Sequence, residues 1–333
     1  MKHAYWGSLL LFALCPSGSL AQAPDYAQLQ SGYLSSKDYD KAIDAGVKGL
    51  AQDPANLGLA YNNLKASEGK KDAEGIRKWA TESSRIARSI VQNAKNDDEG
   101  KRQADYARQV DVYTEYSLFA AATQSTAPAD IINLFTALEQ QNPKSQYLER
   151  AAGPYLHALQ QGGRASEAGP AAERILVNNP DCDDALLIAA DYSLSHKENA
   201  KAAEHAGKLV EVLNAQKKPD GVADADWEKQ KNTKLGLAHW YAGIAYSAQS
   251  KFAEADKSLR QAVPLIEGND QYLGVALFNL GLADYKLAKS GRNKALLQDA
   301  LKFSQRAAGI KGPFQNQAAA NVRVIRTEMG GRK

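Results

Sequence analysis

The chain has 333 residues, of which 24% are charged and 8% are aromatic, and its formal net charge is +3. A hydrophobic content of 44% excludes general disorder, and the length suffices for one large or two ordinary domains. Alternating runs of Val, Ile and Thr are absent, while Ala, Leu, Lys and Gln abound. This composition predicts an all-α fold.

Residues 1–21 have the features of a secretory signal peptide. A lysine and a histidine precede an apolar run over residues 4–15, and small residues lead to a cleavage site after Ala21, or alternatively after Ala23. The run is too short to span a bilayer comfortably. We therefore expect an exported protein, periplasmic or secreted. Its mature form would keep Cys182 as its one cysteine and form no internal disulfide.

Helical hairpins are predicted over residues 22–218. The first hairpin places Tyr33 before a polar turn, Ala42 nine residues later and Pro54 at its end. Further prolines stand at positions 143, 180 and 219, at intervals of 37 and 39 residues, each near the end of an amphipathic pattern. Such regular spacing indicates a repeated helical unit.

A longer helix is predicted within that region, over residues 103–122. Tyr106, Val110, Tyr113 and Leu118 follow one another at spacings that mark one helical face. We expect this face to be buried against the neighbouring helices.

Residues 219–313 contain the clearest hairpin pattern. Acidic residues at positions 224, 226 and 228 favour a helix start, so residues 219–233 are expected to extend the following helix. Gly243 and Ala255 are small residues, one on each helix of the hairpin, where they would let two backbones approach. A seven-residue insertion around residues 288–294 delays the next helix. Residues 314–333 are predicted to form a capping helix and a basic tail.

These hairpins resemble the tetratricopeptide repeat (TPR), whose pattern runs W-x2-L-G-x2-Y, then A-x3-F, then P. Within residues 236–270, four residues match in register: Gly243, Tyr246, Ala255 and Ala262. Tyr33 and Tyr192 are assigned to the place of Tyr246 in their own hairpins. The resemblance implies an alpha-alpha superhelix, a TPR-like solenoid of about seven helical hairpins closed by the capping helix.

The resemblance also implies a binding surface, because the first helices of successive TPR repeats line a concave groove. It assigns eight residues to that groove: Leu237, Trp240, Ile244 and Ser247 in one repeat, and Val275, Phe278, Leu282 and Tyr285 in the next. Trp240 and Ile244 replace the lysine and asparagine with which TPR clamps hold a C-terminal carboxylate, so a receptor for chaperone tails is not expected. Alternatively, these residues are covered by Trp227, by the extension over residues 219–233 or by the insertion around residues 288–294.

Catalytic and metal-binding motifs are missing from the sequence. Ser67 and Lys70 have S-x-x-K spacing, but the S-D-N and K-T-G partners of such serine enzymes are absent. No two histidines have metal-ligand spacing, so His239 is expected to be a hydrogen-bonded packing residue. The acidic residues at 181–184 lack the glycine and glutamate of a calcium-binding loop and are assigned to helix capping. We therefore predict no enzymatic activity, no cofactor and no metal.

Charge is distributed unevenly along the chain. From Lys286 to Lys333 there are eleven basic and two acidic residues, a net charge of +9, whereas the remainder carries 30 basic and 36 acidic residues. The basic end is represented by Lys302, Arg306, Arg323 and Arg326. It suits an anionic envelope surface, although a solvated helical face is the simpler explanation. Nucleic acid is not expected as a partner, because it does not fit an exported location.

Two functional hypotheses follow. The first is a non-catalytic scaffold that binds a protein or peptide partner, because stacked hairpins leave a long groove as their exposed surface. The second is a carrier or sensor of a small apolar or glycan ligand held in the aromatic groove.

Overall fold

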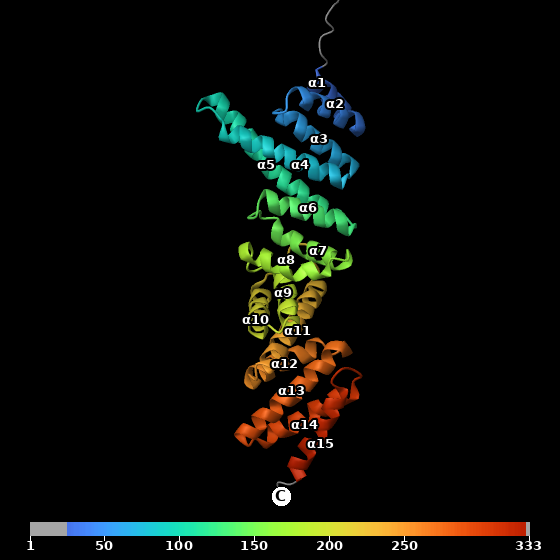
Figure 1. Cartoon of the computed structure of the whole chain (residues 1–333), viewed down its shortest axis with the longest axis vertical. Coiled ribbons are helices and arrows are strands. Elements are labelled where there is room, and N and C mark those ends of the chain that lie inside the picture. Colours follow the sequence, from blue (N-terminus) through green and yellow to red (C-terminus); the bar gives the residue numbers. More distant parts are fainter. Residues whose placement is uncertain (1–24, 331–333) are drawn as a thin grey trace, which may run out of the picture.

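A computed structural model describes residues 25–330, so the predicted signal peptide lies outside the described part of the chain. Residues 25–330 form fifteen α-helices and no strand, arranged as an elongated column (Figure 1). Helix α1 (Tyr26–Ser35) lies at one end of the column and α15 (Gln315–Gly330) at the other. The all-α prediction is confirmed.

The first fourteen helices pack as seven sequential pairs. They are α1 with α2 (Tyr39–Gln52), α3 (Leu57–Lys70) with α4 (Ala73–Gln92), α5 (Asp98–Gln124) with α6 (Pro128–Gln141), α7 (Leu148–Gln161) with α8 (Ala165–Asn178), α9 (Asp183–Ser195) with α10 (Asn199–Ala215), α11 (Asp224–Ala248) with α12 (Phe252–Leu265), and α13 (Asp270–Gly291) with α14 (Lys294–Gly309). Helix α15 then packs on α13 and α14. Within residues 25–330, every helix contacts only helices one or two places away in the chain. The predicted solenoid of hairpins with a capping helix is therefore confirmed.

Six of the seven pairs turn through the same backbone motif. One residue in each turn has a positive φ, and these residues are Lys37, Lys71, Gly163, Lys197, Ser250 and Arg292. The N–H of the following residue bonds to the carbonyl five residues earlier, as from Asp38 to Tyr33 and from Lys251 to Tyr246. This is the Schellman motif, which satisfies carbonyls that a helix end leaves open.

The shared turn also corrects the predicted register of Tyr192. The bond in the fifth pair runs from Glu198 to the carbonyl of Ser193, so Ser193 is the counterpart of Tyr33 and Tyr246. The prediction for Tyr192 is wrong by one residue. Its ring instead lies against Gly169, where an added Cβ would be 2.0 Å from the tyrosine Cδ2.

Helix α5 is longer than the sequence pattern indicated. Asp97 caps it by accepting the Gly100 N–H at 2.7 Å, so residues 98–102, which precede the predicted range of 103–122, form its first turn. This end of α5 projects from the column (Figure 1). Val110 and Leu118 are buried as expected, but Tyr106 is 47% exposed. The prediction for Tyr106 is wrong because the projecting end has too few neighbours to cover it.

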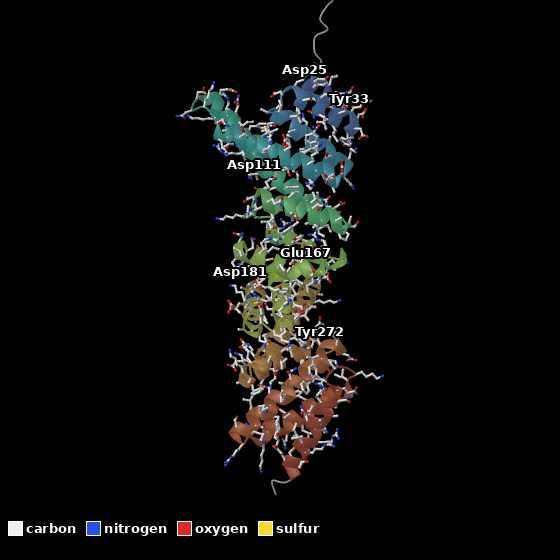
Figure 2. The ribbon with its side chains drawn as sticks, viewed as in Figure 1. Asp25, Tyr33, Asp111, Glu167, Asp181 and Tyr272 are labelled. Carbon is white, nitrogen blue, oxygen red and sulfur yellow. The ribbon has the colours of Figure 1, made fainter. Side chains whose placement is uncertain are left out.

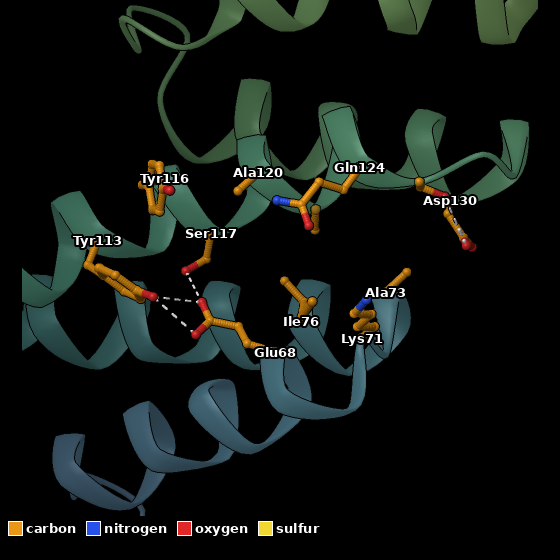
Figure 3. Close-up of a pocket in the computed structure, with 12 residues that line it drawn as sticks. Glu68, Lys71, Ala73, Ile76, Tyr113, Tyr116, Ser117, Ala120, Gln124 and Asp130 are labelled. Carbon is orange, nitrogen blue, oxygen red and sulfur yellow. Dashed lines mark hydrogen bonds between the residues drawn. The ribbon is translucent and has the colours of Figure 1, made fainter.

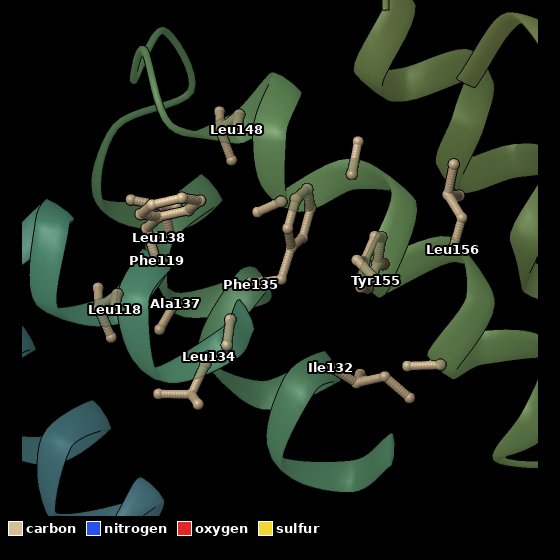
Figure 4. Packing of buried hydrophobic residues seen from close by; sticks show 14 of the residues in the cluster. Leu118, Phe119, Ile132, Leu134, Phe135, Ala137, Leu138, Leu148, Tyr155 and Leu156 are labelled. Atoms are coloured by element: carbon tan, nitrogen blue, oxygen red, sulfur yellow. The ribbon is translucent and has the colours of Figure 1, made fainter. Parts of the chain in front are cut away.

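The largest core cluster runs through the middle of the column, from α3 to α9. Figure 4 shows its centre, where the rings of Phe135 on α6 and Tyr155 on α7 stack with centroids 4.0 Å apart. Both rings are buried, and Leu134, Leu138 and Leu156 around them are almost fully enclosed. Each pair thus buries its apolar face against the next pair, and the core extends along the stack.

The pair α13 with α14 contains an insertion that the pair α11 with α12 lacks, and the inserted residues are part of longer helices. Gly243 on α11 lies against Leu259 of α12, and Gly281 on α13 lies against Ser304 of α14. In the sequence, Gly281 and Ser304 lie seven residues further apart than Gly243 and Leu259 do. The added residues lengthen the two helices, because α13 continues to Gly291 and α14 starts after the Asn293 cap. Seven residues make about two helical turns, so the packed faces stay in register.

Candidate functional site

A cleft of about 490 Å³ lies at the C-terminal end of the column, between α11, α13 and the segment that leads into α15. Its walls are mostly apolar and include Trp240, Tyr272, Val275, Ile310 and Phe314. The N-terminal end of α13 supplies Tyr272, which lies in the C-terminal third of the molecule (Figure 2). Three separate helical units thus build one concave surface.

Trp240 is held in place within this cleft. Its indole N–H donates a hydrogen bond to the carbonyl of Tyr272 at 3.0 Å. The rings of Tyr241 and Tyr272 meet it edge to face, with centroids 5.1 Å and 5.2 Å away. A tryptophan needs such a partner for its N–H when it is partly buried. The ring is therefore already positioned before any ligand arrives.

The eight residues assigned to the groove do not share one surface. Trp240 and Val275 line the cleft, whereas Ser247 is buried and donates to the side-chain oxygen of Asn279 at 2.9 Å. Leu237, Ile244 and Leu282 are partly buried along α11 and α13.

The capping segment covers the remaining two groove residues. Phe278 stacks on Phe314 at 4.5 Å, and the Tyr285 hydroxyl donates to Glu328 of α15 at 2.6 Å. Phe278 and Tyr285 are therefore covered, but by α15 and its preceding loop, a segment that the alternative did not name.

The polar groups of the cleft are few. Lys311 and Asp270 line it, and neither side chain has an ion-pair partner within residues 25–330.

His239 is half-buried, and burial lowers its pKa, so its imidazole is neutral at pH 7. No hydrogen-bond partner of His239 lies in the described part of the chain, so the expected hydrogen bond is not formed.

A second hollow, of about 330 Å³, lies in the N-terminal half between α3, α4, α5 and the start of α6 (Figure 3). Glu68 points into it and accepts hydrogen bonds from the Tyr113 hydroxyl at 3.0 Å and from Ser117 at 2.5 Å. Lys65 forms an ion pair with the same carboxylate at 3.2 Å. These three partners hold Glu68 in a structural role.

Sequence patterns did not group the aromatic residues beside this second hollow, and named only Tyr113 among them, as part of a helical face. Tyr61 comes from α3, Tyr113, Tyr116 and Phe119 come from α5, and Tyr147 precedes α7. Neighbouring rings among them have centroids 5.1 to 6.5 Å apart. The rings belong to three repeats, so no single window of the sequence brings them together. The unusual density of tyrosine on α5 was the available signal.

The remaining sequence candidates do not form a reactive site. Asp183 and Asp184 both pair with the Lys234 ammonium, at 2.8 Å and 2.7 Å. Ser67 is buried, and Lys70 pairs with Asp40 on another hairpin. Within residues 25–330, no group of three or more His, Cys, Asp or Glu side chains is arranged so that it could hold a metal ion.

The basic end is only partly neutralised. Arg306 pairs with Glu267 at 2.6 Å, whereas Lys302, Arg323 and Arg326 are exposed and have no ion-pair partner within residues 25–330. None of the helices in this range has the length and hydropathy of a membrane span.

The repeated hairpins, their common turn and their strictly sequential packing decide the architecture. The chain is a TPR-like helical repeat protein. No protein-family model and no curated protein matches it. Among solved structures, it is similar to the TPR domain of P58(IPK), with 10% sequence identity over 92% of this chain and 99% of that chain and a TM-score of 0.32. A likeness at this level carries no information on ligands, and the TPR-like architecture rests on the packing described above.

Proposed function

We propose that this TPR-like chain is a non-catalytic scaffold that binds a segment of a protein or peptide partner in its C-terminal cleft, in the periplasm or outside the cell. One observation carries the choice of site: the Trp240 ring is fixed by the Tyr272 carbonyl beside Val275 in an open, mostly apolar cleft. A ring fixed beforehand loses little conformational freedom on binding. Fixed aromatic side chains are also typical anchors of protein interfaces.

Site-specific photo-crosslinking tests this proposal. A photoreactive side chain at Val275 should capture a protein from the native envelope extract, and the Trp240→Ala variant should reduce the yield about tenfold. The matched position is Val177, which is 78% exposed on α8, away from the cleft. Trp240→Phe keeps a ring and controls for folding. Equal labelling from Val275 and Val177 would contradict the proposal.

The cleft volume also favours a second candidate, a carrier or sensor of a small apolar or glycan ligand. About 490 Å³ lies within the range of roughly 300 to 1,000 Å³ that is usual for small-molecule sites. This candidate predicts that Val275 captures no protein, and that the chain purified from its source carries a small molecule that native mass spectrometry detects. Loss of that mass in Trp240→Ala would place the ligand in the cleft.

We propose further that the basic end contacts an anionic envelope surface. Lys302, Arg323 and Arg326 are the uncompensated cations that support this idea. Cosedimentation with anionic vesicles should weaken as salt rises, and it should weaken when these three residues are changed to glutamine. Arg306→Gln is the matched control, because Arg306 is already paired with Glu267. Vesicle binding that changes neither with salt concentration nor with the change of these three residues to glutamine would exclude this contact.

A further inference from the structure

Aromatic residues of the N-terminal half form a continuous row of rings, which we call the aromatic ledge and define as Tyr61, Tyr113, Tyr116, Phe119 and Tyr147. Phe119 is buried, and Tyr61, Tyr113 and Tyr147 are half-buried. Successive ring centroids are 5.6 Å apart from Tyr61 to Tyr113, 5.9 Å from Tyr113 to Tyr116 and 6.0 Å from Tyr116 to Tyr147. Tyr116 is 46% exposed. Tyrosine offers a large, rigid contact area at a low cost in side-chain entropy, as in antibody combining sites.

Arg150 places an uncompensated positive charge at one end of the ledge. Its guanidinium carbon lies 4.8 Å from the centroid of the Phe119 ring. The side chain is exposed, and it has no hydrogen-bond or ion-pair partner within residues 25–330. A guanidinium that rests on a ring keeps its N–H edge free, and this edge matches the two oxygens of a carboxylate.

The acidic groups around the ledge are already engaged or directed elsewhere. Glu68 is held by three partners, and Glu115 is 9% exposed and accepts a hydrogen bond from the Asn142 amide at 2.9 Å. Glu149, next to Arg150 in sequence, lines a separate hollow with Lys208. At the far end of the second hollow, Lys71 and Asp130 carry opposite charges (Figure 3). The charge that remains available at the ledge is therefore positive.

The second hollow supplies an apolar patch beside this charge, and the rest of its lining, about half, is polar. Ala73, Ile76, Ala120 and Ala121 contribute to its lining, and Tyr116 belongs to both the hollow and the ledge. The step from the Tyr116 ring to the Phe119 ring is 6.5 Å, and Arg150 is a further 4.8 Å away. An extended peptide advances about 3.3 Å per residue, so two to four residues cover this path.

We propose that the aromatic ledge docks an acidic segment of a protein partner, with an apolar side chain in the second hollow and a carboxylate on Arg150 two to four residues away. This inference extends the proposed function to a second site. The two sites lie in opposite halves of the column and share no residue, so each can fail without the other.

Selection from a random 12-residue peptide display library on the full chain tests this inference. Enriched peptides should share an apolar residue two to four positions from Asp or Glu. Arg150→Gln and Tyr116→Ala should each weaken their binding about tenfold or more. Arg164→Gln is the matched control, since Arg164 is an exposed arginine already paired with Glu167. Trp240→Ala should leave these peptides bound, which separates this site from the C-terminal cleft.

A repeat selection on Arg150→Glu distinguishes recognition from a structural role. The enriched peptides should then carry Lys or Arg in place of the acidic residue, because the charge at that point of the ledge is reversed. The proposal is overturned if the wild-type chain enriches no peptide, if enriched peptides lack the acidic residue, or if Arg150→Glu selects the same peptides as the wild type.

Discussion

Gly243 sets the distance between α11 and α12. A Cβ at this position would lie 2.5 Å from Leu259 Cγ and 3.3 Å from the Leu259 backbone nitrogen. Leu259 is fully buried, so a shift of its side chain would disturb the packing of its neighbours. Gly243→Ala should therefore lower the free energy of unfolding by about 1 to 3 kcal/mol through overpacking. Gly207 on α10 has no atom within 4 Å of the same point, so Gly207→Ala should raise it by about 0.5 to 1 kcal/mol. Denaturant titration of both variants measures the contrast, and equal effects would disprove the packing argument.

At the turn residues with positive φ, we expect a change to glycine to stabilise the chain, in contrast to glycine inside a helix. Lys197 is exposed and has a φ of 61°, a conformation that disfavours a residue with a Cβ by about 1 kcal/mol or more. Lys197→Gly should therefore stabilise the chain by a few tenths of a kcal/mol to about 1 kcal/mol. Lys229 is an exposed lysine inside α11, and Lys229→Gly should destabilise it by about 1 kcal/mol. Thermal melts that shift in the same direction for both variants would contradict this.

At the scale of helices, α12, α13 and α14 meet around a partly buried cluster of one arginine and three aspartates. The Arg260 guanidinium donates to Asp256 at 2.6 Å, to Asp284 at 2.8 Å and to Asp299 at 3.2 Å. Asp284 is fully buried, and one of its oxygens has no hydrogen-bond partner within residues 25–330. Burial, together with the neighbouring Asp256 carboxyl, raises the pKa of Asp284 to about 8 despite the nearby arginine.

This cluster makes stability depend on pH. The folded chain holds a proton on Asp284 that an unfolded aspartate, with its pKa near 3.9, has already released at neutral pH. The free energy of unfolding should therefore fall as pH rises from about 4 to 8, by up to about 1.4 kcal/mol per pH unit from this group, and this loss should end above pH 8. In the Asp284→Asn variant the side chain has no titratable proton, so the free energy of unfolding should depend less on pH between about 4 and 8. Denaturant titrations at pH 5.5, 7 and 8.5 on both proteins measure it, and an unchanged slope in the variant would refute the assignment.

Helix boundaries show where sequence reasoning succeeds and where it stops. Periodic apolar residues located the pairs, and prolines marked their ends, because both signals are local. The turns through Lys37, Lys71 and Lys197 have a lysine and no glycine at the position with positive φ, so sequence alone offered no residue that marks the left-handed position. The exposure of Tyr106 depends on how far α5 extends beyond its neighbours, and a helical pattern contains no such information.

At the scale of the molecule, sequence reasoning assigned the groove from one repeat at a time. Of its eight residues, Trp240 and Val275 line the C-terminal cleft, and their role in binding a partner stays a prediction. Sequence reasoning could not foresee that Phe314 covers Phe278, because these residues lie on different helical units. The aromatic ledge was missed for the same reason, since three repeats contribute its rings.

The capping helix should protect only the repeats that it touches. Ala318 and Ile325 of α15 are buried against apolar clusters of α12, α13 and α14. Deletion of residues 314–333 should expose these clusters and speed amide hydrogen exchange in α13 and α14. Exchange in α6, α7 and α8 should stay the same, because no contact reaches them from α15. Faster exchange along the whole column would show that the stack unfolds as one unit.

Contacts that never reach beyond the second neighbour also give the column a mechanical character. Within residues 25–330, no contact joins distant repeats. When the two ends of the column are pulled, each interface between pairs can therefore rotate slightly, and the changes in length add up. The column therefore behaves as a spring whose stiffness is set by the interfaces in series. A partner that grips both the aromatic ledge and the C-terminal cleft would hold this spring at one extension.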